Sequence, residues 1–469
     1  MTATTTAPET AGSITVIDPH DGTTLARVAT TNPLRATEAI GAAAAELPHW
    51  MRLAPAERGK ALEGVADRLE AAAGGLAELV HDEVGIPVSD ARAGVQAGVA
   101  TLRQYAQLGP VHRGHSLRGD LYAADYTVTR PRGVALVLTP WNDPVAVACG
   151  LLGAALVTGN TVVHKPSERA VLVGDRLGQI VSAGLPEGVC HTLIGDASLG
   201  RALVADPRIG VIAHVGSTRA GRDIAARAAT TGAHVIRENG GKDALVVDAG
   251  VDPRWAAQQA ALGAFANAGQ ICTSVERILV HRQVADPFLE ELVARAGAYG
   301  PPQRDQPLVD RRLREDVHGQ VVAALTAGAR LLTGGRIPDG PGSYYPPTVL
   351  ADCHPSMEVM SQETFGPVAP VRVVDSFEEG LRVAADSEYG LAGTVLTGRL
   401  DHALRSVAEL PVGTLKVNAV FGGAPGGSAQ PLRASGSGFG YGPELLDEMT
   451  TTGVVHLAGA PRPADGEAS

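Results

Sequence analysis

Short apolar segments alternate with alanine-rich segments of helical period from residue 133 onward, and this alternation limits the folds open to the chain. The strand-like segments read VALVL, TVVHK, VCHTL, VIAHV, HVIRE and ALVVD, and helical segments such as 145–157 and 170–183 lie between them. Strands and helices in this order are typical of βαβ units, in which helices cover a parallel sheet. The sequence therefore predicts an α/β fold.

A second series begins after Asp252 with a helix that we expect to continue through Ala268, and it extends to a strand near Thr394. At 469 residues the chain is long enough for two or three domains. We expect a boundary within 238–252, because sheet-forming sequence restarts there around a pair of glycines. The residues before 110 are mainly helical in pattern, and the end segments MTATTTAPET and APRPADGEAS have a composition typical of disorder.

The charge balance argues against nucleic acid and anionic membranes as partners. The formal net charge is −11, the pI is about 5.7, and no run of lysine and arginine forms a basic patch. The first residues lack the basic start and apolar core of a secretory signal, and prolines and glycines interrupt the apolar stretch 133–163. We therefore expect a cytoplasmic protein without membrane contact.

The cysteines raise the question of one particular thiol. The chain has four cysteines, which are too scattered for a disulfide framework and include no CxxC pair: Cys149, Cys190, Cys272 and Cys353. We expect all of them to be reduced, and Cys272 in GQICTS is either a buried filler or a nucleophile. Among the 14 histidines only His112 and His115 are closely spaced, and without further ligands beside them we expect no metal site.

Turns after the predicted strands carry polar groups that are weak signals when taken alone. TPWNDP could aim the Asn142 amide at an oxyanion, although a turn of this composition is more often only a turn. HKPSE could bind ribose hydroxyls or be a solvated turn, and the helix start in HVGSTRAG could bind a pyrophosphate or only be capped. Glu238 in IRENGGKD could activate a water molecule. The glycine-rich segment 421–442 is either a flexible loop or a flap over a site.

These motifs, in this order, resemble those of the aldehyde dehydrogenase superfamily over residues 14 to 457. TPWNDP matches the family's PWNxP, ENGGK matches E-L-G-G-K, FANAGQICTS matches the Gly-Gln-x-Cys nucleophile segment, and ETFGP (363–367) matches E-x-F-G-P. KPSE and GSTRAG match as well. The resemblance implies that the protein oxidises a small-molecule aldehyde to a carboxylic acid. NAD would be the cofactor, with NADP as an alternative, and the reaction would pass through a thioester that water hydrolyses.

The resemblance also assigns roles to residues. It makes Cys272 the catalytic thiol, Glu238 the general base, and Asn142 the oxyanion donor together with the backbone N–H of Cys272. Gly269 would leave room for cofactor or substrate beside the thiol. The adenosine ribose would meet Lys165, Ser167 and Glu168, the pyrophosphate would meet Gly216 and Ser217, and the nicotinamide ribose would meet Glu363. The whole cofactor-binding set implied is Thr139, Pro140, Trp141, Lys165, Ser167, Glu168, Gly216, Ser217, Gly240, Glu363 and Phe365.

The domain organisation implied has three parts. A discontinuous, Rossmann-type NAD-binding domain would span 1–111 and 132–240, and an α/β catalytic domain would span 241–447. A small β oligomerisation element would comprise 112–131 and 448–462, followed by a tail at 463–469. Its hairpin-like HSLRGDLYAADYTVTR and strand-like TGVVHL are expected to pair between subunits of a homodimer or homotetramer, because an exposed ribbon is marginal alone.

Several positions depart from the family pattern. Asn239 stands where leucine is usual, and its contact is expected through the backbone. Asp143 replaces an aromatic or apolar residue at the mouth of the substrate tunnel, where it either caps the helix starting at Pro144 or Val145 or selects hydroxy- and aminoaldehydes. The family's P-F-G-G-x-K-x-S-G is replaced by PGGSAQPLRASGSG, and Gly440 stands where many members carry glutamate.

Alternative functions stay open at this point. A CoA-acylating aldehyde dehydrogenase would lack the general-base glutamate, and a non-catalytic binding protein would not need the thiol or the Asn142 amide. A papain-like hydrolase would need a histidine placed to pair with Cys272. The aldehyde is not named by the sequence: Gly150 stands where some members carry an arginine for carboxylate-tipped substrates, and Arg433 could substitute for it. A carboxylate at Glu168 favours NAD over NADP.

Overall fold

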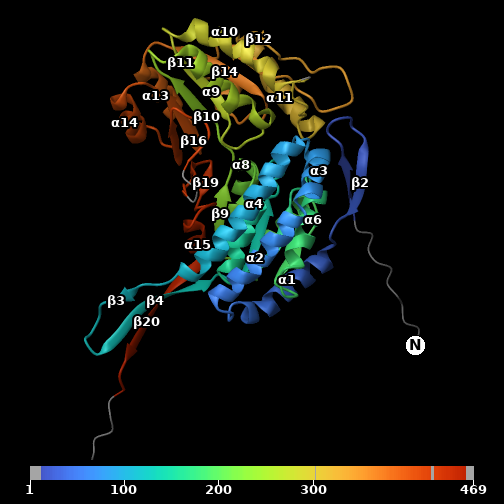
Figure 1. Ribbon diagram of the computed structural model, residues 1–469, viewed down its shortest axis with the longest axis vertical. Coiled ribbons are helices and arrows are strands. Elements are labelled where there is room, and N and C mark those ends of the chain that lie inside the picture. The colour runs from blue at the N-terminus through green and yellow to red at the C-terminus, as the bar shows by residue number, and fades with distance from the viewer. Residues whose placement is uncertain (1–11, 302, 424–426, 461–469) are drawn as a thin grey trace, which may run out of the picture.

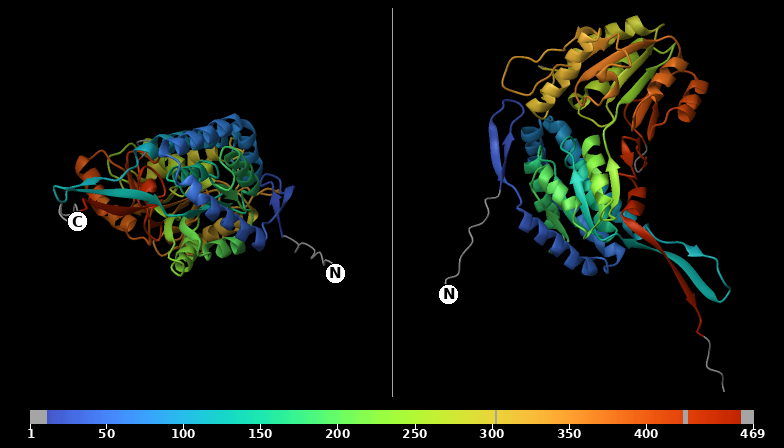
Figure 2. Two further views of the ribbon diagram at one scale, coloured as in Figure 1. Left: turned by 90° about the horizontal axis from the view of Figure 1, so that it is seen from below. Right: turned by 180° about the vertical axis from the view of Figure 1, so that it is seen from behind.

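The computed structural model describes residues 12–301, 303–423 and 427–460. The end segments with a composition typical of disorder lie outside this range, apart from Ala460. Figure 1 shows two lobes, which we call the first lobe (helices α1–α8, blue to green) and the second lobe (α9–α14, yellow to orange). A ribbon of strands, the arm, projects from the first lobe, and Figure 2 shows the same projection from behind.

The first lobe contains a six-stranded sheet in the order β19-β9-β8-β5-β6-β7. Its five parallel strands are β5 (Val134–Thr139), β6 (Thr161–Pro166), β7 (Cys190–Thr192), β8 (Ile209–Val215) and β9 (His234–Glu238), and the short β19 (Gly436–Ser437) is antiparallel to β9. β5 and β6 are buried along their whole length, as expected for central parallel strands, and β6 includes the buried polar residues His164 and Lys165 near its end.

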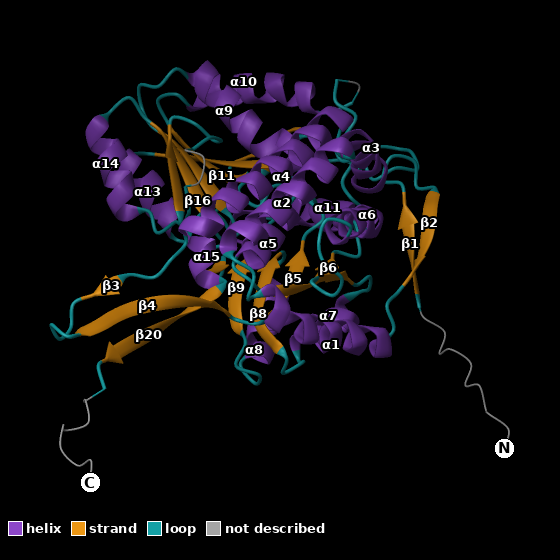
Figure 3. Ribbon diagram, turned by 60° about the horizontal axis from the view of Figure 1, so that its bottom comes forward, coloured by secondary structure: helices purple, strands orange, loops and turns teal. Residues whose placement is uncertain are grey.

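Helices cover both faces of this sheet. Ala135 and Val137 of β5 pack in one core with α2–α6, and the alternate residues Val134 and Leu136 pack in another with α1, α7 and α8. Figure 3 shows helices on either side of these strands, with α2 and α5 on one side and α1, α7 and α8 on the other. The helices are α1 (Pro33–Trp50), α2 (Pro55–Ala71), α3 (Ala73–Val84), α4 (Val88–Leu108), α5 (Ala146–Val157), α6 (Val171–Ser182), α7 (Ala197–Val204) and α8 (Thr218–Ala228). An N-terminal hairpin, β1 (Ser13–Ile17) and β2 (Thr24–Ala29), lies beside them.

The second lobe contains a seven-stranded sheet in the order β12-β13-β14-β11-β10-β16-β17. Its strands are β10 (Asp243–Val247), β11 (Val275–His281), β12 (Arg330–Thr333), β13 (Thr348–Ala351), β14 (Val368–Val374), β16 (Ala392–Leu396) and β17 (Thr414–Val417). The segment ALVVD, which continues the first series in sequence, thus lies in the second sheet, and the chain passes between the lobes at 239–242.

The helices of the second lobe are α9 (Pro253–Phe265), α10 (Ala285–Ala296), α11 (Arg311–Thr326), α12 (Glu358–Ser361), α13 (Phe377–Ala385) and α14 (Leu400–Glu409). α9 begins where the Asp252 side chain accepts a hydrogen bond from the Arg254 N–H, with proline at its first position. It ends three residues before the predicted Ala268, because Asn267 and Ala268 adopt left-handed backbone angles that a helix cannot continue. No described helix has the length and apolar character needed to cross a bilayer.

The arm is a three-stranded antiparallel sheet of β3 (Ser116–Leu117), β4 (Ala123–Pro131) and β20 (Thr450–Ala458). β20 pairs with β4 from Thr450↔Pro131 to Ala458↔Ala123, so the ends of two distant segments form one ribbon. Before β20 the chain forms α15 (Glu444–Glu448), and β18 (Leu432–Arg433) pairs with β15 (Tyr389–Gly390).

Candidate active site

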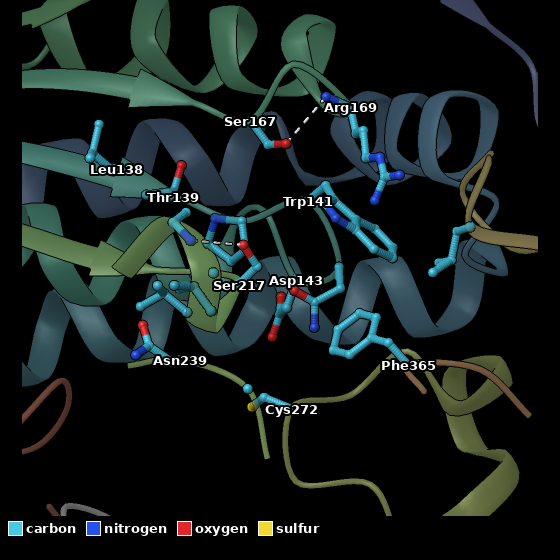
Figure 4. A pocket seen from close by; sticks show the side chains of 18 of the residues that line it. Leu138, Thr139, Trp141, Asp143, Ser167, Arg169, Ser217, Asn239, Cys272 and Phe365 are labelled. Atoms are coloured by element: carbon cyan, nitrogen blue, oxygen red, sulfur yellow. Dashed lines mark hydrogen bonds between the residues drawn. The ribbon is translucent and has the colours of Figure 1, made fainter. Parts of the chain in front are cut away.

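A cavity of about 2000 Å³ is lined by residues of both lobes and includes the carboxyl ends of strands of the first sheet. This is the edge at which open α/β sheets bind ligands. The wall includes every residue predicted for catalysis or cofactor binding: Thr139, Pro140, Trp141, Asn142, Lys165, Ser167, Glu168, Gly216, Ser217, Glu238, Gly240, Cys272, Glu363 and Phe365. Figure 4 shows several of them from within the cavity.

Cys272 lies in a turn between α9 and β11 and faces the cavity, whereas the other three cysteines are buried. Three consecutive residues before it, Asn267, Ala268 and Gly269, have φ angles of 50°, 52° and 73°. This left-handed run turns the backbone away from the axis of α9 and brings the thiol to the cavity wall. The position of the thiol agrees with the nucleophile interpretation and excludes the buried-filler one.

Gly269 has a different role from the one expected. A Cβ at this position would lie 2.2 Å from the Gly366 carbonyl oxygen and 2.9 Å from the Pro367 nitrogen. The space is therefore filled by the ETFGP loop, and the expectation that Gly269 makes room for cofactor or substrate is wrong. The glycine instead lets the nucleophile turn pack closely against the loop that carries Glu363 and Phe365.

Asn142 links the first lobe to the nucleophile turn. Its side-chain Nδ2 donates to the Gln270 carbonyl at 3.0 Å, and the Asn267 side chain donates to the Asn142 carbonyl at 3.4 Å. A side-chain amide has two N–H groups, so one remains for an oxyanion when the other is held by Gln270. The turn after β5 is thus fixed relative to Cys272 by hydrogen bonds across the lobes.

Titratable groups around the thiol have shifted pKa values. Desolvation by the surrounding protein, together with the carboxylates of Asp243, Glu238 and Glu363, raises the pKa of Cys272 to about 12. Burial raises the pKa of Glu238 to about 7, and a hydrogen bond from the Gly440 N–H opposes this shift. Glu238 can therefore accept a proton near neutral pH, while the thiol is protonated until a base or ligand acts on it.

The far end of the cavity combines a helix start with a buried lysine. Ser217 caps α8, and its Oγ accepts from the Ala220 N–H at 3.3 Å. Lys165 is buried with its Nζ donating to the Pro166 carbonyl at 3.0 Å; burial lowers its pKa, and Glu168 and Asp196 oppose this. A free helix N-terminus beside a lysine and a carboxylate suits a pyrophosphate joined to a ribose.

The middle of the cavity is formed by two aromatic rings and a carboxylate. Trp141 and Phe365 meet edge to face at 5.5 Å between ring centroids, and the Arg169 guanidinium lies 5.5 Å from the Trp141 ring (Figure 4). A Cβ at Gly240 would lie 2.0 Å from a Glu363 carboxylate oxygen, so only glycine admits Glu363 there. Burial, followed by Glu276, raises the pKa of Glu363 to about 8.

A buried ion pair supports the ETFGP loop (363–367), and the sequence analysis did not single it out. Lys242 Nζ lies 2.8 Å from Glu276, and the Glu276 carboxylate accepts from the N–H groups of Thr364 and Phe365, both at 2.8 Å. Lys242 belongs to the quoted ENGGK motif, but its partner is on β11 and carries no motif signal. Two further wall residues, Arg169 and His214, were also missed, and only their places at strand ends could have indicated them.

Asp143, the first departure from the family pattern, lies near the start of α5. Asp143 lines the cavity but is not the N-cap of α5, which begins at Ala146 after Val145 without a side-chain cap. Burial raises the pKa of Asp143 to about 6, and the Ala146 N–H opposes the shift. The helix thus begins one residue after the expected Val145, while the contact of Asp143 with the Ala146 N–H is of the kind expected for a capping carboxylate.

Arg433 does not serve the substrate end. Its guanidinium donates to the carbonyls of Ala385 at 3.0 Å and Ser387 at 2.5 Å, and the residue is not part of the cavity wall. The possibility that Arg433 grips a carboxylate-tipped aldehyde is wrong. Asn239 keeps its backbone in place by donating to the Ser435 carbonyl at 2.8 Å, while its side chain donates to Ala434 at 3.0 Å.

The residues of the cavity fit a nicotinamide dinucleotide. Gly216 and Gly240 have no room for a side chain, since a Cβ would lie 2.7 Å from the His214 ring or 2.0 Å from the Glu363 carboxylate, and both side chains thereby stay at the cavity wall. One continuous wall joins the Lys165 end to the Cys272 end, and its volume accommodates a dinucleotide and a small substrate. Lys165, Glu168, Ser217 and Glu363 offer the donors and acceptors that riboses and phosphates require.

Comparison with known proteins agrees with this site. The aldehyde dehydrogenase family model matches residues 6–455. The chain is 34% identical to the 3,6-anhydro-alpha-L-galactose dehydrogenase of Streptomyces coelicolor over 95% of this chain and 93% of the relative, and 33% identical to a betaine aldehyde dehydrogenase of Cereibacter sphaeroides over 97% and 95%. The crystal structure of Staphylococcus aureus betaine aldehyde dehydrogenase in complex with NAD+ matches with a TM-score of 0.92 and 25% identity, over 97% of this chain and 94% of that one. The chain belongs to the aldehyde dehydrogenase family and is an NAD-dependent oxidoreductase of aldehydes.

Proposed function

We propose that Cys272, Glu238 and Asn142 carry out the oxidation and that the aldehyde enters the cavity beside Cys272. The observation that carries this proposal is the meeting of the three side chains on one cavity wall, although they come from the turn after β5, the end of β9 and the turn before β11. Such a set provides a nucleophile, a base and an oxyanion donor.

The first step is the attack of sulfur on the aldehyde carbon. The thiol proton leaves to solvent, the Cys272 Sγ–carbon bond forms, and the carbonyl π electrons move to oxygen. The Asn142 amide and the Cys272 N–H donate to this oxyanion. When bound, the nicotinamide accepts the hydride that leaves the same carbon as the thioester forms.

The second step is hydrolysis of the thioester. Glu238 takes a proton from a water molecule, the water oxygen bonds to the acyl carbon, and the carbon–sulfur bond breaks to release a carboxylic acid and the Cys272 thiolate. The presence of Glu238 favours hydrolysis over transfer to CoA. Addition of CoA is expected to leave the rate of carboxylate formation unchanged.

Lys165, Ser167 and Glu168 would hold the adenosine ribose of the cofactor, and Gly216 and Ser217 would hold its pyrophosphate. The remaining residues of the predicted cofactor set would bind its nicotinamide half: Thr139, Pro140, Trp141, Gly240, Glu363 and Phe365. The carboxylate of Glu168 accepts from ribose hydroxyls and repels a 2′-phosphate, which favours NAD over NADP.

The arm supports a homodimer or homotetramer. Tyr122, Val454 and Leu457 on the arm are 87%, 70% and 54% exposed, and β20 has a free edge in the described sheet. Exposed apolar edges of this kind are unfavourable in a monomer and suit pairing with a second copy. Sedimentation at micromolar concentration is expected to show a dimer or tetramer, and a monomer would contradict this assignment.

The experiment that tests the catalytic proposal is Cys272→Ala. We expect folded protein with no aldehyde-dependent NADH formation, because the variant has no sulfur to attack the carbonyl. Cys353→Ala is the matched control, since Cys353 is buried in the second lobe and is expected to leave turnover largely intact. Substantial NADH formation by Cys272→Ala would refute the proposal.

A further inference from the structure

The described part of the glycine-rich segment, 427–442, runs from the second lobe to the strand that carries the base. Its residues Gly436–Ser437 form β19, and in the antiparallel pairing with β9 Gly436 lies opposite Glu238. The hydrogen bond from the Asn239 N–H to the Ser435 carbonyl continues this pairing past the end of β9. Within this described part, Gly436–Ser437 is thus an edge strand that lies beside Glu238.

A carboxylate from α15 anchors the turn that follows β19. Glu448 Oε1 accepts from the Phe439 N–H at 3.2 Å, and its other oxygen lies 2.5 Å from His234 Nε2 on β9. The turn is thus tied to the first lobe on both sides. Residue 440, which directly follows Phe439, has little freedom to move away from Glu238.

Gly440 touches the base directly. Its N–H donates to Glu238 Oε1 at 3.0 Å. A Cβ at this position would lie 2.1 Å from Glu238 Cγ and 2.6 Å from Oε1. The φ angle of Gly440 lies outside the left-handed region, so its backbone conformation does not require glycine. The space occupied by the Glu238 side chain is what excludes a larger residue.

The hydrogen bond acts on the charged form of the base. An N–H donated to a carboxylate stabilises the anion, and here it opposes the desolvation that raises the pKa of Glu238. The titratable group that faces Glu238 from the second lobe is Cys272. Loss of the Gly440 contact therefore removes a stabilising group from the anion and leaves the destabilising ones.

We propose that Gly440 is a positioning residue for the general base: its N–H binds the Glu238 carboxylate, and its lack of a side chain leaves the room that Glu238 needs. The proposal rests on the role proposed above for Glu238. Under this proposal the glycine-rich segment has a function. The Gly440 N–H, which β19 and Glu448 hold in place, contacts the base at a position where many family members carry a glutamate side chain.

The test is Gly440→Ala, compared with wild type in steady-state and pre-steady-state NADH formation. Because the added Cβ displaces the carboxylate, we expect turnover at pH 7 to fall about tenfold, as for the loss of a hydrogen bond to a charged group. The burst of NADH is expected to persist, and the acid limb of the pH–rate profile is expected to move to higher pH. Gly64→Ala on α2 is the control, since nothing lies within 4 Å of its added Cβ.

A double variant separates this proposal from the role of Glu238. If Glu238→Gln turns over at the wild-type rate, the proposed base is wrong. If Glu238→Gln is slow but Gly440→Ala has the wild-type rate and pH profile, only the positioning role is wrong. Gly440→Ala is expected to add little in the Glu238→Gln background, and an equal loss there would show a purely structural effect and overturn the proposal.

A second test replaces the base by aspartate, whose side chain is shorter, and it can be interpreted even if Gly440→Ala alone folds poorly. Glu238→Asp withdraws the carboxylate from the space that the alanine Cβ enters. We expect Glu238→Asp combined with Gly440→Ala to recover folded yield relative to Gly440→Ala alone and to show no further loss of turnover relative to Glu238→Asp. A double variant that is worse than either single one would contradict the contact.

Discussion

The two ends of the cavity are assembled in different ways. At the cofactor end, Lys165 and Glu168 follow β6, and Gly216 and Ser217 follow β8, so one sheet and its short loops supply the groups. At the thiol end, Asn142 and Glu238 come from the first lobe and Cys272 from the second. The cofactor end can therefore form within one lobe, whereas the chemistry exists only when both lobes pack together.

The electrostatics differ in the same way. At the cofactor end, burial lowers the pKa of Lys165, and the opposite charges of Glu168 and Asp196 counteract this shift. Around Cys272 the carboxylates of Asp243, Glu238 and Glu363 act together, and desolvation with their charge raises the pKa of the thiol. At the thiol end, packing keeps carboxylates close to one another and to the thiol although their charges repel. Substitutions of these residues are therefore expected to have large effects on the rate.

The largest effect is expected for Glu238→Gln. Loss of a general base typically costs about 10² to 10⁴ in rate, and here it acts on the thioester, so steady-state turnover falls while a burst of NADH persists. Hydroxylamine, a stronger nucleophile than water, is expected to restore part of the turnover. In wild type, Glu238 is deprotonated above its pKa of about 7, so hydrolysis rises with pH through 7 and is lost below it. Wild-type steady-state rates in the variant would refute the role.

The next effect is expected for Lys242→Met, which leaves the Glu276 carboxylate buried without its ion-pair partner. Removal of one partner of a buried pair costs about 3–5 kcal/mol, and the loop that holds Glu363 and Phe365 loses its support. We expect a lower melting temperature and a higher KM for NAD. Lys242→Met combined with Glu276→Gln is the control, and it is expected to recover part of the stability. An unchanged KM for NAD would show that the loop does not depend on this pair.

A moderate effect is expected for Glu168→Gln, which removes the charge at the adenosine ribose. The ratio of kcat/KM for NAD to that for NADP is expected to fall about tenfold, since one close like-charge contact is relieved. Glu63→Gln, at an exposed position on α2, is the matched control. A preference for NADP in wild type would mean that Glu168 does not face the ribose.

The smallest effect is expected at Asp143, where a cavity-wall carboxylate lies near the start of α5. Asparagine keeps an acceptor for the Ala146 N–H but removes the charge. We expect Asp143→Asn to keep the melting temperature and to lower kcat/KM for aminoaldehydes relative to simple aliphatic aldehydes by up to about fivefold, the value of a partly exposed charge contact. Asp143→Phe also removes the acceptor, with a loss of about 1 kcal/mol in stability. If both variants rank the substrates as wild type does, Asp143 does not select hydroxy- and aminoaldehydes.

The sequence predicts the cofactor end better than the thiol end, and the reason is the length of chain between contacting residues. The alternation from residue 133 locates β5, β6, β8 and β9, and polar groups at strand ends then fall on one edge of the sheet. Gly269 packs against Gly366, and Glu238 packs against Gly440. The residues of each pair lie far apart in the sequence, so no local sequence pattern predicts the contact. The surroundings of Asp143 and Arg433 depend on distant neighbours in the same way, so the start of α5 was placed one residue early and the expectation for Arg433 was wrong.

The most direct test of the difference between the two ends is the affinity of Cys272→Ala for NAD, measured by titration in the absence of aldehyde. Because the groups of the cofactor end follow β6 and β8 of the first lobe, we expect the dissociation constant to match that of wild type within the error of the titration, while NADH formation is abolished. A large loss of NAD affinity in this variant would show that the thiol end helps to build the cofactor site, and would contradict the separation of the two ends.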